Sequence, residues 1–320
     1  MAHLLEHDPL LDRHFADAGA SANRAAERIL APLRDSDWPE VAWSFSRLTA
    51  CGYPLELSFG DGPTVRYTAE VAAPEVANSQ RLELAIATAA ELGGAAPPLR
   101  TAQVLASLQR RSPLLFGAWL GARHSSGGDL YKLYAETPRQ IGPFEMLSLG
   151  VPAADLDVAV SARGVGVELS GDRPLHEVYY RFDESVEPWQ VERVIGRFGM
   201  GGAIAALGDL VESATGRAFE RVAHGRYLGF SIAAASGGGA LAFALFCYAR
   251  RVFGSDAQAR QRLLRLAAAR GWDFERYAAA TASIADRQAS GAHGVAAFVV
   301  DRRGEASLQV TVCPREVAPQ

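Results

Sequence analysis

The chain has 320 residues, of which 49% are hydrophobic and 21% charged, and its formal net charge is -4. A chain of this length can bury a large core, and its weak negative charge excludes a general attraction to nucleic acid or to an anionic membrane surface. Cys51, Cys247 and Cys313 show no CxxC pair and no zinc-type spacing, which indicates free thiols in a reducing cytoplasm. The first residues lack a basic segment followed by an apolar run, so we expect no secretory signal.

Helical and strand periodicities alternate regularly along the chain. The expected helices span 16–33, 38–49, 79–93, 100–111, 188–199, 201–215, 255–270 and 273–285. The expected strands come in pairs joined by polar or Gly-rich turns: 54–59 with 64–71, 114–123 with 130–136, 164–170 with 175–182, 226–234 with 240–249, and 294–301 with 306–312. Residues 138–160 give a less certain pattern. The repeating unit is therefore α-β-β-α, present about five times.

The longest uncharged stretch runs from Tyr227 to Ala249 and has the length of a transmembrane helix. Gly237, Gly238 and Gly239 interrupt it midway, and each half has the length of a strand. A buried β-hairpin therefore fits this stretch better than a membrane span.

Hairpins that follow one another in this way make antiparallel neighbours. Ten such strands avoid exposed edges if they close into a barrel with the helices outside. Because eight strands already leave just enough room for side chains, a ten-stranded barrel should enclose a central chamber. We expect an α+β protein with one barrel domain over residues 1–320. Two α+β domains of about 160 residues each are the alternative, but they explain the even strand spacing less well.

Lys132 is the only lysine of the chain. It lies in the expected strand of DLYKLYAETP, residues 129–138, where the period of two places Lys132 and Tyr134 on one face. In the first strand pair, Arg66 shares a face with Thr68 and Glu70. There are two alternatives to a functional role: a solvent-exposed face for Lys132 and Tyr134, and an ion pair of Arg66 with Glu70 or a neighbouring acid.

Three segments resemble the dimethylallyltryptophan synthase family of aromatic prenyltransferases. YPLELSFGDGPTVRYTAEV, residues 53–71, resembles the family's Pro-x-Glu-x-Ser strand and the Val-Arg-Tyr-Thr-x-Glu strand after it. Lys132-Leu133-Tyr134 is similar to its Lys-x-Tyr element, and CYARRVFGSDAQARQRLLRLAAARGWD, residues 247–273, to its strand end, Asp-bearing turn, helix and Gly-Trp. The five units match the family's fold, the ABBA fold or PT-barrel, in the form of a short bacterial member.

The resemblance implies an enzyme that transfers a dimethylallyl or longer prenyl group from its diphosphate to an indole, a tryptophan-derived molecule or another electron-rich aromatic. This reaction needs cations beside the diphosphate, aromatic faces beside the allyl cation and a base for the acceptor. The resemblance makes Glu56 the base, with Lys132 and Tyr134 as the other catalytic residues. It implies diphosphate contacts from Arg66, Lys132, Arg181 and Arg226, and shielding by Tyr134, Tyr179 and Tyr227.

No metal motif and no required cofactor are expected, although a magnesium ion is one way to add positive charge. The expected partners are the prenyl diphosphate and an aromatic small molecule, without nucleic acid or membrane. The reaction is expected in the cytoplasm.

The third strand pair departs from the family pattern. Glu177, Tyr179 and Arg181 share a face where the family has Arg-x-Lys-x-Tyr, and Glu177 would repel a diphosphate. The fourth pair offers apolar residues and Cys247, and the last offers Gln309 and Thr311. Either magnesium adds charge, or other arginines such as Arg123 substitute, or the diphosphate site is degraded. In the last case the barrel binds or rearranges an aromatic ligand without a prenyl donor, which is the alternative function.

Overall fold

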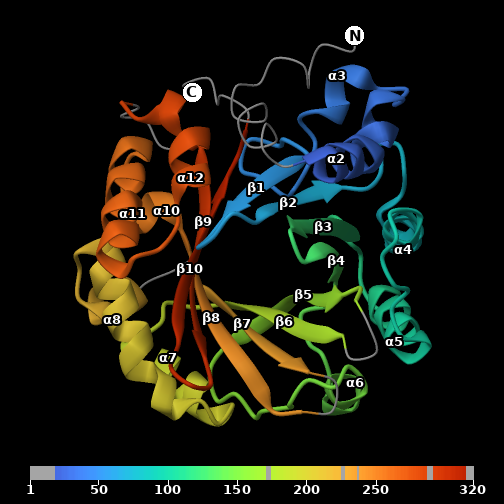
Figure 1. The fold of residues 1–320 in the computed structure, drawn as a ribbon. Coiled ribbons are helices and arrows are strands. Elements are labelled where there is room, and N and C mark those ends of the chain that lie inside the picture. Colours follow the sequence, from blue (N-terminus) through green and yellow to red (C-terminus); the bar gives the residue numbers. More distant parts are fainter. Residues whose placement is uncertain (1–18, 171–173, 225–227, 236–237, 287–290, 315–320) are drawn as a thin grey trace.

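The computed structural model describes residues 19–170, 174–224, 228–235, 238–286 and 291–314. Ten antiparallel strands close into a barrel in the order β1-β10-β9-β8-β7-β6-β5-β4-β3-β2 (Figure 1). The strands are β1 (Leu55–Phe59), β2 (Val65–Glu70), β3 (Ala118–Ser125), β4 (Gly128–Glu136), β5 (Val160–Glu168), β6 (Leu175–Phe182), β7 (Gly229–Ala235), β8 (Ala240–Tyr248), β9 (His293–Asp301) and β10 (Ala306–Val312). The predicted ten-stranded α+β barrel is confirmed.

Helices surround the strands on the outside of the barrel (Figure 1). The α-helices are α2 (Gly19–Arg34), α3 (Pro39–Ala42), α4 (Arg81–Glu91), α5 (Leu99–Gln109), α6 (Pro143–Ser148), α7 (Pro188–Arg197), α8 (Ile204–Thr215), α9 (Phe219–Ala223), α10 (Ala249–Val252), α11 (Asp256–Arg270) and α12 (Glu275–Ala280). Short 3-10 turns are η2 (Asn78–Gln80), η3 (Gly201–Ala203) and η4 (Ala282–Ile284). Each hairpin is thus flanked by helices, as the repeat predicted.

The helix expected over 38–49 is wrong beyond its first turn, because α3 ends at Ala42. Side chains after it bond to nearby backbone groups instead: Ser46 Oγ accepts from the Leu48 amide, and Thr49 Oγ1 donates to the Tyr53 carbonyl. Such local bonds compete with helical ones. The predicted loop between 123 and 130 is also too long, because β3 and β4 stay paired up to Ser125 and Gly128.

The uncharged stretch after residue 227 forms β7 and β8, which pair antiparallel as the predicted hairpin. Within the described ranges, no helix is long and apolar enough to cross a membrane.

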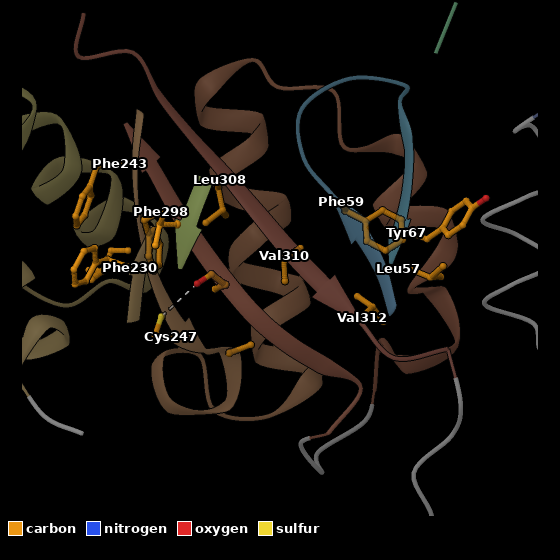
Figure 2. Packing of buried hydrophobic residues seen from close by; sticks show 14 of the residues in the cluster. Leu57, Phe59, Tyr67, Phe230, Phe243, Cys247, Phe298, Leu308, Val310 and Val312 are labelled. Atoms are coloured by element: carbon orange, nitrogen blue, oxygen red, sulfur yellow. Dashed lines mark hydrogen bonds between the residues drawn. The ribbon is translucent and has the colours of Figure 1, made fainter. Parts of the chain in front are cut away.

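The hydrophobic core lies between the barrel and its helices. In β1, Leu55, Leu57 and Phe59 are buried, and the Phe59 ring packs edge-on against Tyr277 of α12. Figure 2 shows this outward-facing layer continuing along β10, β9, β8 and β7 through Val310, Val312, Phe298, Phe243 and Phe230. Because strand side chains alternate, the remaining residues of every strand point into the barrel.

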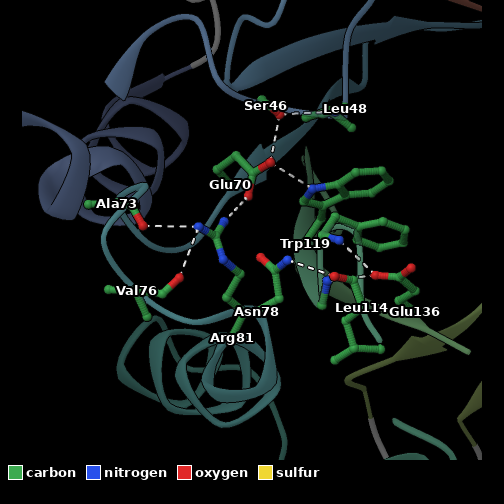
Figure 3. Close-up of polar contacts among 12 residues, drawn as sticks. Ser46, Leu48, Glu70, Ala73, Val76, Asn78, Arg81, Leu114, Trp119 and Glu136 are labelled. Carbon is green, nitrogen blue, oxygen red and sulfur yellow. Dashed lines mark hydrogen bonds and ion pairs between the residues drawn. The ribbon is translucent and has the colours of Figure 1, made fainter. Parts of the chain in front are cut away.

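A buried ion pair joins the end of β2 to the start of α4 (Figure 3). Arg81 Nη1 donates to Glu70 Oε2 at 2.6 Å, and both side chains are at most 3% exposed. Glu70 Oε1 accepts from Ser46 Oγ at 2.6 Å and from the Trp119 indole N–H at 2.9 Å. The expected alternative of an Arg66–Glu70 pair is therefore not what the structure shows, because Glu70 is paired with Arg81.

Replacing Arg81 with Met should lower the free energy of unfolding by about 3–5 kcal/mol, because it leaves the Glu70 carboxylate buried without its cation. Urea unfolding of the purified protein measures the change. The control is Arg28→Met, which removes a half-exposed pair with Glu91 and should cost at most about 1 kcal/mol. Equal losses in the two variants would contradict the prediction.

Candidate functional site

The barrel encloses a chamber of about 810 Å³, a volume that suits a small-molecule ligand. Its charged lining residues are Arg66, Arg123, Lys132, Arg163, Arg181, Glu56, Glu168 and Glu177. All of them come from β1 to β6, and the described lining residues of β7 to β10 are uncharged. The chamber therefore has one charged half and one largely apolar half.

Lys132 of β4 faces the chamber, as the alternation predicted. Its ammonium forms an ion pair with Glu177 and donates to the Tyr179 hydroxyl at 3.1 Å. The ammonium also lies 5.3 Å from the Tyr134 ring centroid and 5.6 Å from that of Tyr179. Burial is the largest single influence and acts to lower the pKa of Lys132, but the attraction and hydrogen bond to Glu177, together with the charges of Tyr134 and Glu168, raise it overall. Lys132 is therefore a cation held by a carboxylate.

Glu177 is the carboxylate that holds Lys132, across 45 residues of sequence. It also accepts hydrogen bonds from the Tyr179 hydroxyl at 2.6 Å and from the Ser231 hydroxyl. Burial acts to raise the pKa of Glu177, but the Lys132 charge and these hydrogen bonds lower it overall. The third strand pair thus contributes a negative charge at the position where the resemblance implied a cation.

Inward-facing glycines make room for the three predicted catalytic side chains. A Cβ on Gly166 would lie 2.5 Å from Cε of Lys132, and a Cβ on Gly121 would lie 2.8 Å from a Tyr134 ring carbon. A Cβ on Gly294 would lie 2.7 Å from Oε1 of Glu56. Isolated glycines inside strands often mark a close approach of this kind, so Gly121, Gly166 and Gly294 are the signal in the sequence that could have located these side chains.

An aromatic wall lies beside Lys132. The Tyr134 and Tyr179 rings have centroids 5.9 Å apart, and Tyr179 stacks on Phe246 of β8 at 5.8 Å. The structure thus brings Tyr134 and Tyr179 together as predicted, and it adds Phe246, which the sequence placed only in an apolar strand. Tyr227 and Arg226, also predicted for the site, lie outside the described residues.

Glu56 of β1 lies in the same chamber, and its pKa is raised to about 7. Burial is the main cause, a hydrogen bond from Thr311 opposes it, and the charge of Cys51 adds to it. The Sγ atoms of Cys51 and Cys313 are 2.6 Å apart, and the hydrogen bond between them is the main reason why the pKa of Cys51 falls to about 5. None of the three cysteines forms a disulfide within the described residues. Negative charge on Cys51 is therefore one of the influences that raise the pKa of Glu56.

The chamber arginines form two groups. Arg66 and Arg123 are direct cross-strand partners on β2 and β3. Arg163 and Arg181 interact at the other end, where Arg181 is 3.5 Å from Asp183. Glu168 of β5 acts through its charge on Arg66 of the first group. Arg163 of the second group lies five residues before Glu168, which is about 16 Å along the strand. The structure therefore does not bring Arg181 together with Arg66 and Lys132, whereas it places Arg123 with them.

Within the described residues, no group of three or more His, Cys, Asp or Glu side chains is placed to hold a metal ion.

No protein-family model and no curated protein matches this chain. Several solved structures do. The 5-dimethylallyltryptophan synthase of Streptomyces coelicolor is 15% identical in sequence to this chain. Its TM-score is 0.73, and the match covers 97% of both chains. The 6-dimethylallyltryptophan synthase of Micromonospora olivasterospora is 19% identical with TM-score 0.72 over 96% of both. The prenyltransferase PriB is 16% identical with TM-score 0.71, over 96% of this chain and 94% of that one. At such identities the likeness shows the fold, and the predicted ABBA prenyltransferase barrel is confirmed.

Replacing Cys51 with Ser should lower the pKa of Glu56 below 7, because it removes the nearby negative charge that disfavours ionisation of the carboxyl. Titration of the ¹³C-labelled Glu56 carboxyl by NMR measures the shift. The control is Cys247→Ala: burial raises the pKa of this chamber thiol to about 12, so it carries no charge at neutral pH. An unchanged or raised pKa in Cys51→Ser would show that Cys51 does not act on Glu56 through its charge.

Proposed function

We propose that this protein is an enzyme that transfers a dimethylallyl group from dimethylallyl diphosphate to an indole, a tryptophan-type molecule or another electron-rich aromatic. The observation that carries the proposal is the content of the chamber. It combines Glu56, a carboxyl with pKa near 7, with the aromatic wall and the inward-facing cations of β2 to β4. Two structures of similar fold support it: the Micromonospora enzyme is in complex with DMASPP and Trp, and PriB is in complex with L-tryptophan and dimethylallyl thiolodiphosphate.

On the donor side, the allylic C–O bond breaks and its electron pair leaves with the phosphate oxygen. Arg66, Arg123 and Lys132 line the chamber, and in this proposal they stabilise the negative charge that develops on the leaving group. The faces of Tyr134 and Tyr179 attract the allyl cation, as they already attract the Lys132 ammonium. Enclosure by the barrel keeps water from capturing the cation.

On the acceptor side, the aromatic ring attacks the allyl carbon and must then lose a proton. Glu56 lines the same chamber and accepts that proton in this proposal, which its pKa near the working pH supports. The uncharged wall of β7 to β10 supplies an apolar surface against which an aromatic ring can pack. The step is balanced: a bond forms between the aromatic ring and the allyl carbon, the allylic C–O bond breaks, and the ring proton ends on Glu56.

The reaction in this form uses only the chain's own cations, so we propose no metal and no cofactor. The proposed setting is the cytoplasm, because the cysteines form no disulfide within the described residues.

A second candidate is a chamber that binds or rearranges an aromatic ligand without a prenyl donor. The Lys132–Glu177 ion pair favours it, because this pair takes the lysine's charge away from any diphosphate. The assay below distinguishes the two candidates.

Incubation with dimethylallyl diphosphate and a panel of indoles and phenols should yield products heavier by one isoprene unit, detected by mass spectrometry. Lys132→Ala should reduce turnover by roughly 10²–10³-fold, because the lysine stabilises charge in the transition state. The control is Arg193→Ala, a half-exposed arginine paired with Asp157. Unchanged turnover in Lys132→Ala would exclude Lys132 from the reaction, and no product with any acceptor would favour the second candidate.

Glu56→Gln should slow acceptor turnover by about 10²–10⁴-fold while leaving donor binding intact, because only proton removal is lost. In the parent protein kcat/KM should rise with pH through about 7, as Glu56 ionises, and the residual activity of Glu56→Gln should lack this rise. Ser58→Ala, which alters the next inward-facing residue of β1, is the matched control. Normal turnover in Glu56→Gln would show that Glu56 is not the base.

A further inference from the structure

Cys51 and Cys313 meet beside the seam where β1 and β10 close the barrel. Cys51 lies in the loop before β1, and Cys313 directly follows the last residue of β10. Their Sγ atoms are 2.6 Å apart, whereas the two sulfurs of a disulfide are about 2.0 Å apart. Within the described residues, no group of three or more potential ligands is placed to hold a metal. The contact is therefore suited to a bond between the two sulfurs.

The backbone on each side of the contact holds its cysteine in place. Gly52, the residue after Cys51, has a φ of 80°, and a Cβ there would lie 2.1 Å from the Ser44 carbonyl oxygen. This turn therefore requires glycine. On the other side, the Cys313 amide donates to the Ala292 carbonyl at 2.7 Å. The two sulfurs are thus brought together by fixed backbone rather than by a chance encounter of loose chains.

The two thiols differ in exposure and in reactivity. Cys51 is partly exposed, whereas Cys313 is 3% exposed. The hydrogen bond with Cys313 is the largest influence on the pKa of Cys51 and lowers it to about 5, although burial opposes it. The thiolate is the form of cysteine that reacts with peroxides. Cys51 is therefore the attacking sulfur, and Cys313 is placed to resolve the product.

Cys247 gives the contrast within the same chain. Burial raises its pKa to about 12, so it stays protonated at neutral pH. Its Sγ donates to the Ala296 carbonyl at 3.8 Å. A buried, protonated thiol reacts slowly with oxidants, so oxidation should select the other two cysteines.

We propose that a peroxide oxidises Cys51 and Cys313 to a reversible disulfide, and that this bond removes the negative charge that acts on Glu56. The Cys51 thiolate attacks one peroxide oxygen and hydroxide leaves, which gives a sulfenic acid. The Cys313 thiol then attacks the Cys51 sulfur, the S–S bond forms and water leaves with the thiol proton. The two sulfurs lose two electrons in total, and hydrogen peroxide is reduced to water. A dithiol reductant restores both thiols, as expected for a cytoplasmic disulfide, which is usually transient.

The disulfide changes the surroundings of Glu56. Burial is the main cause of the raised pKa of Glu56, and the charge of Cys51 adds to it. A sulfur in a disulfide carries no charge, so the pKa of Glu56 should fall on oxidation. The redox pair goes beyond the proposed function, whereas its effect on turnover rests on that function: the pH at which the base ionises then moves down.

Mass spectrometry of the full chain tests the bond. The protein is reduced, freed of reductant and exposed to a small excess of hydrogen peroxide at neutral pH, and the remaining thiols are alkylated after unfolding. The parent protein should retain one alkylatable thiol, that of Cys247, and yield a peptide that joins Cys51 to Cys313. Cys247→Ala is the matched control and should form the same bond, whereas Cys313→Ser should form none. A dithiol reductant should restore all three thiols of the parent protein.

Titration of the ¹³C-labelled Glu56 carboxyl by NMR tests the effect of the bond. The pKa of Glu56 should be lower in the oxidised parent protein than in the reduced one, and peroxide should leave it unchanged in Cys51→Ser. An unchanged pKa in a parent protein that carries the disulfide would overturn the link to Glu56.

Three alkylatable thiols after peroxide treatment would overturn the proposal, and so would a disulfide that includes Cys247. The peptide map of the parent protein decides the matter even if a variant fails to fold. Neither measurement uses a prenyl donor or an acceptor, so their outcomes are independent of the turnover assay that tests the proposed function.

Discussion

Pairing between β1 and β10 is the constraint on which the rest of the structure depends. It converts a series of hairpins into a closed barrel and leaves no strand edge without a partner. Ten strands close at a diameter that inward side chains do not fill. The outward residues, such as Leu57 and Phe59, then form the core with the helices (Figure 2). The inward residues are released from packing and are available for chemistry.

Charges in such a chamber need partners because they are shielded from bulk water. The described cations of the chamber differ in whether they have such a partner. Lys132 has an internal partner in Glu177, with Tyr179 and Ser231 completing the hydrogen bonds. Arg66 and Arg123 have no hydrogen-bonded or ion-paired partner among the described residues, so a bound anionic ligand would supply it. The contrast between a satisfied and an unsatisfied cation locates the place where an anionic ligand would bind.

The chamber has two halves of different character. Cations and carboxylates come from β1 to β6, whereas β7 to β10 present uncharged side chains. In the proposed reaction the anionic donor would bind in the first half, and the aromatic acceptor would pack on the second. Tyr134, Tyr179 and Phe246 lie where the halves meet, since Tyr179 of β6 stacks on Phe246 of β8. In the proposed reaction the aromatic wall would therefore lie between donor and acceptor, where the allyl cation forms.

The sequence by itself determined the number of strands, the barrel, and the inward orientation of Lys132 with Tyr134, because alternation and turn chemistry are local properties of the chain. It did not determine which inward residues meet. Glu177 reaches Lys132 across 45 residues, and Cys313 reaches Cys51 beside Glu56 across 262. The early end of α3 likewise depends on local bonds around Ser46 and on its contact with Glu70. Periodicity fixes the side to which a residue points, but the register between strands and the closure of the barrel decide its neighbours, and neighbours set its charge and its chemistry.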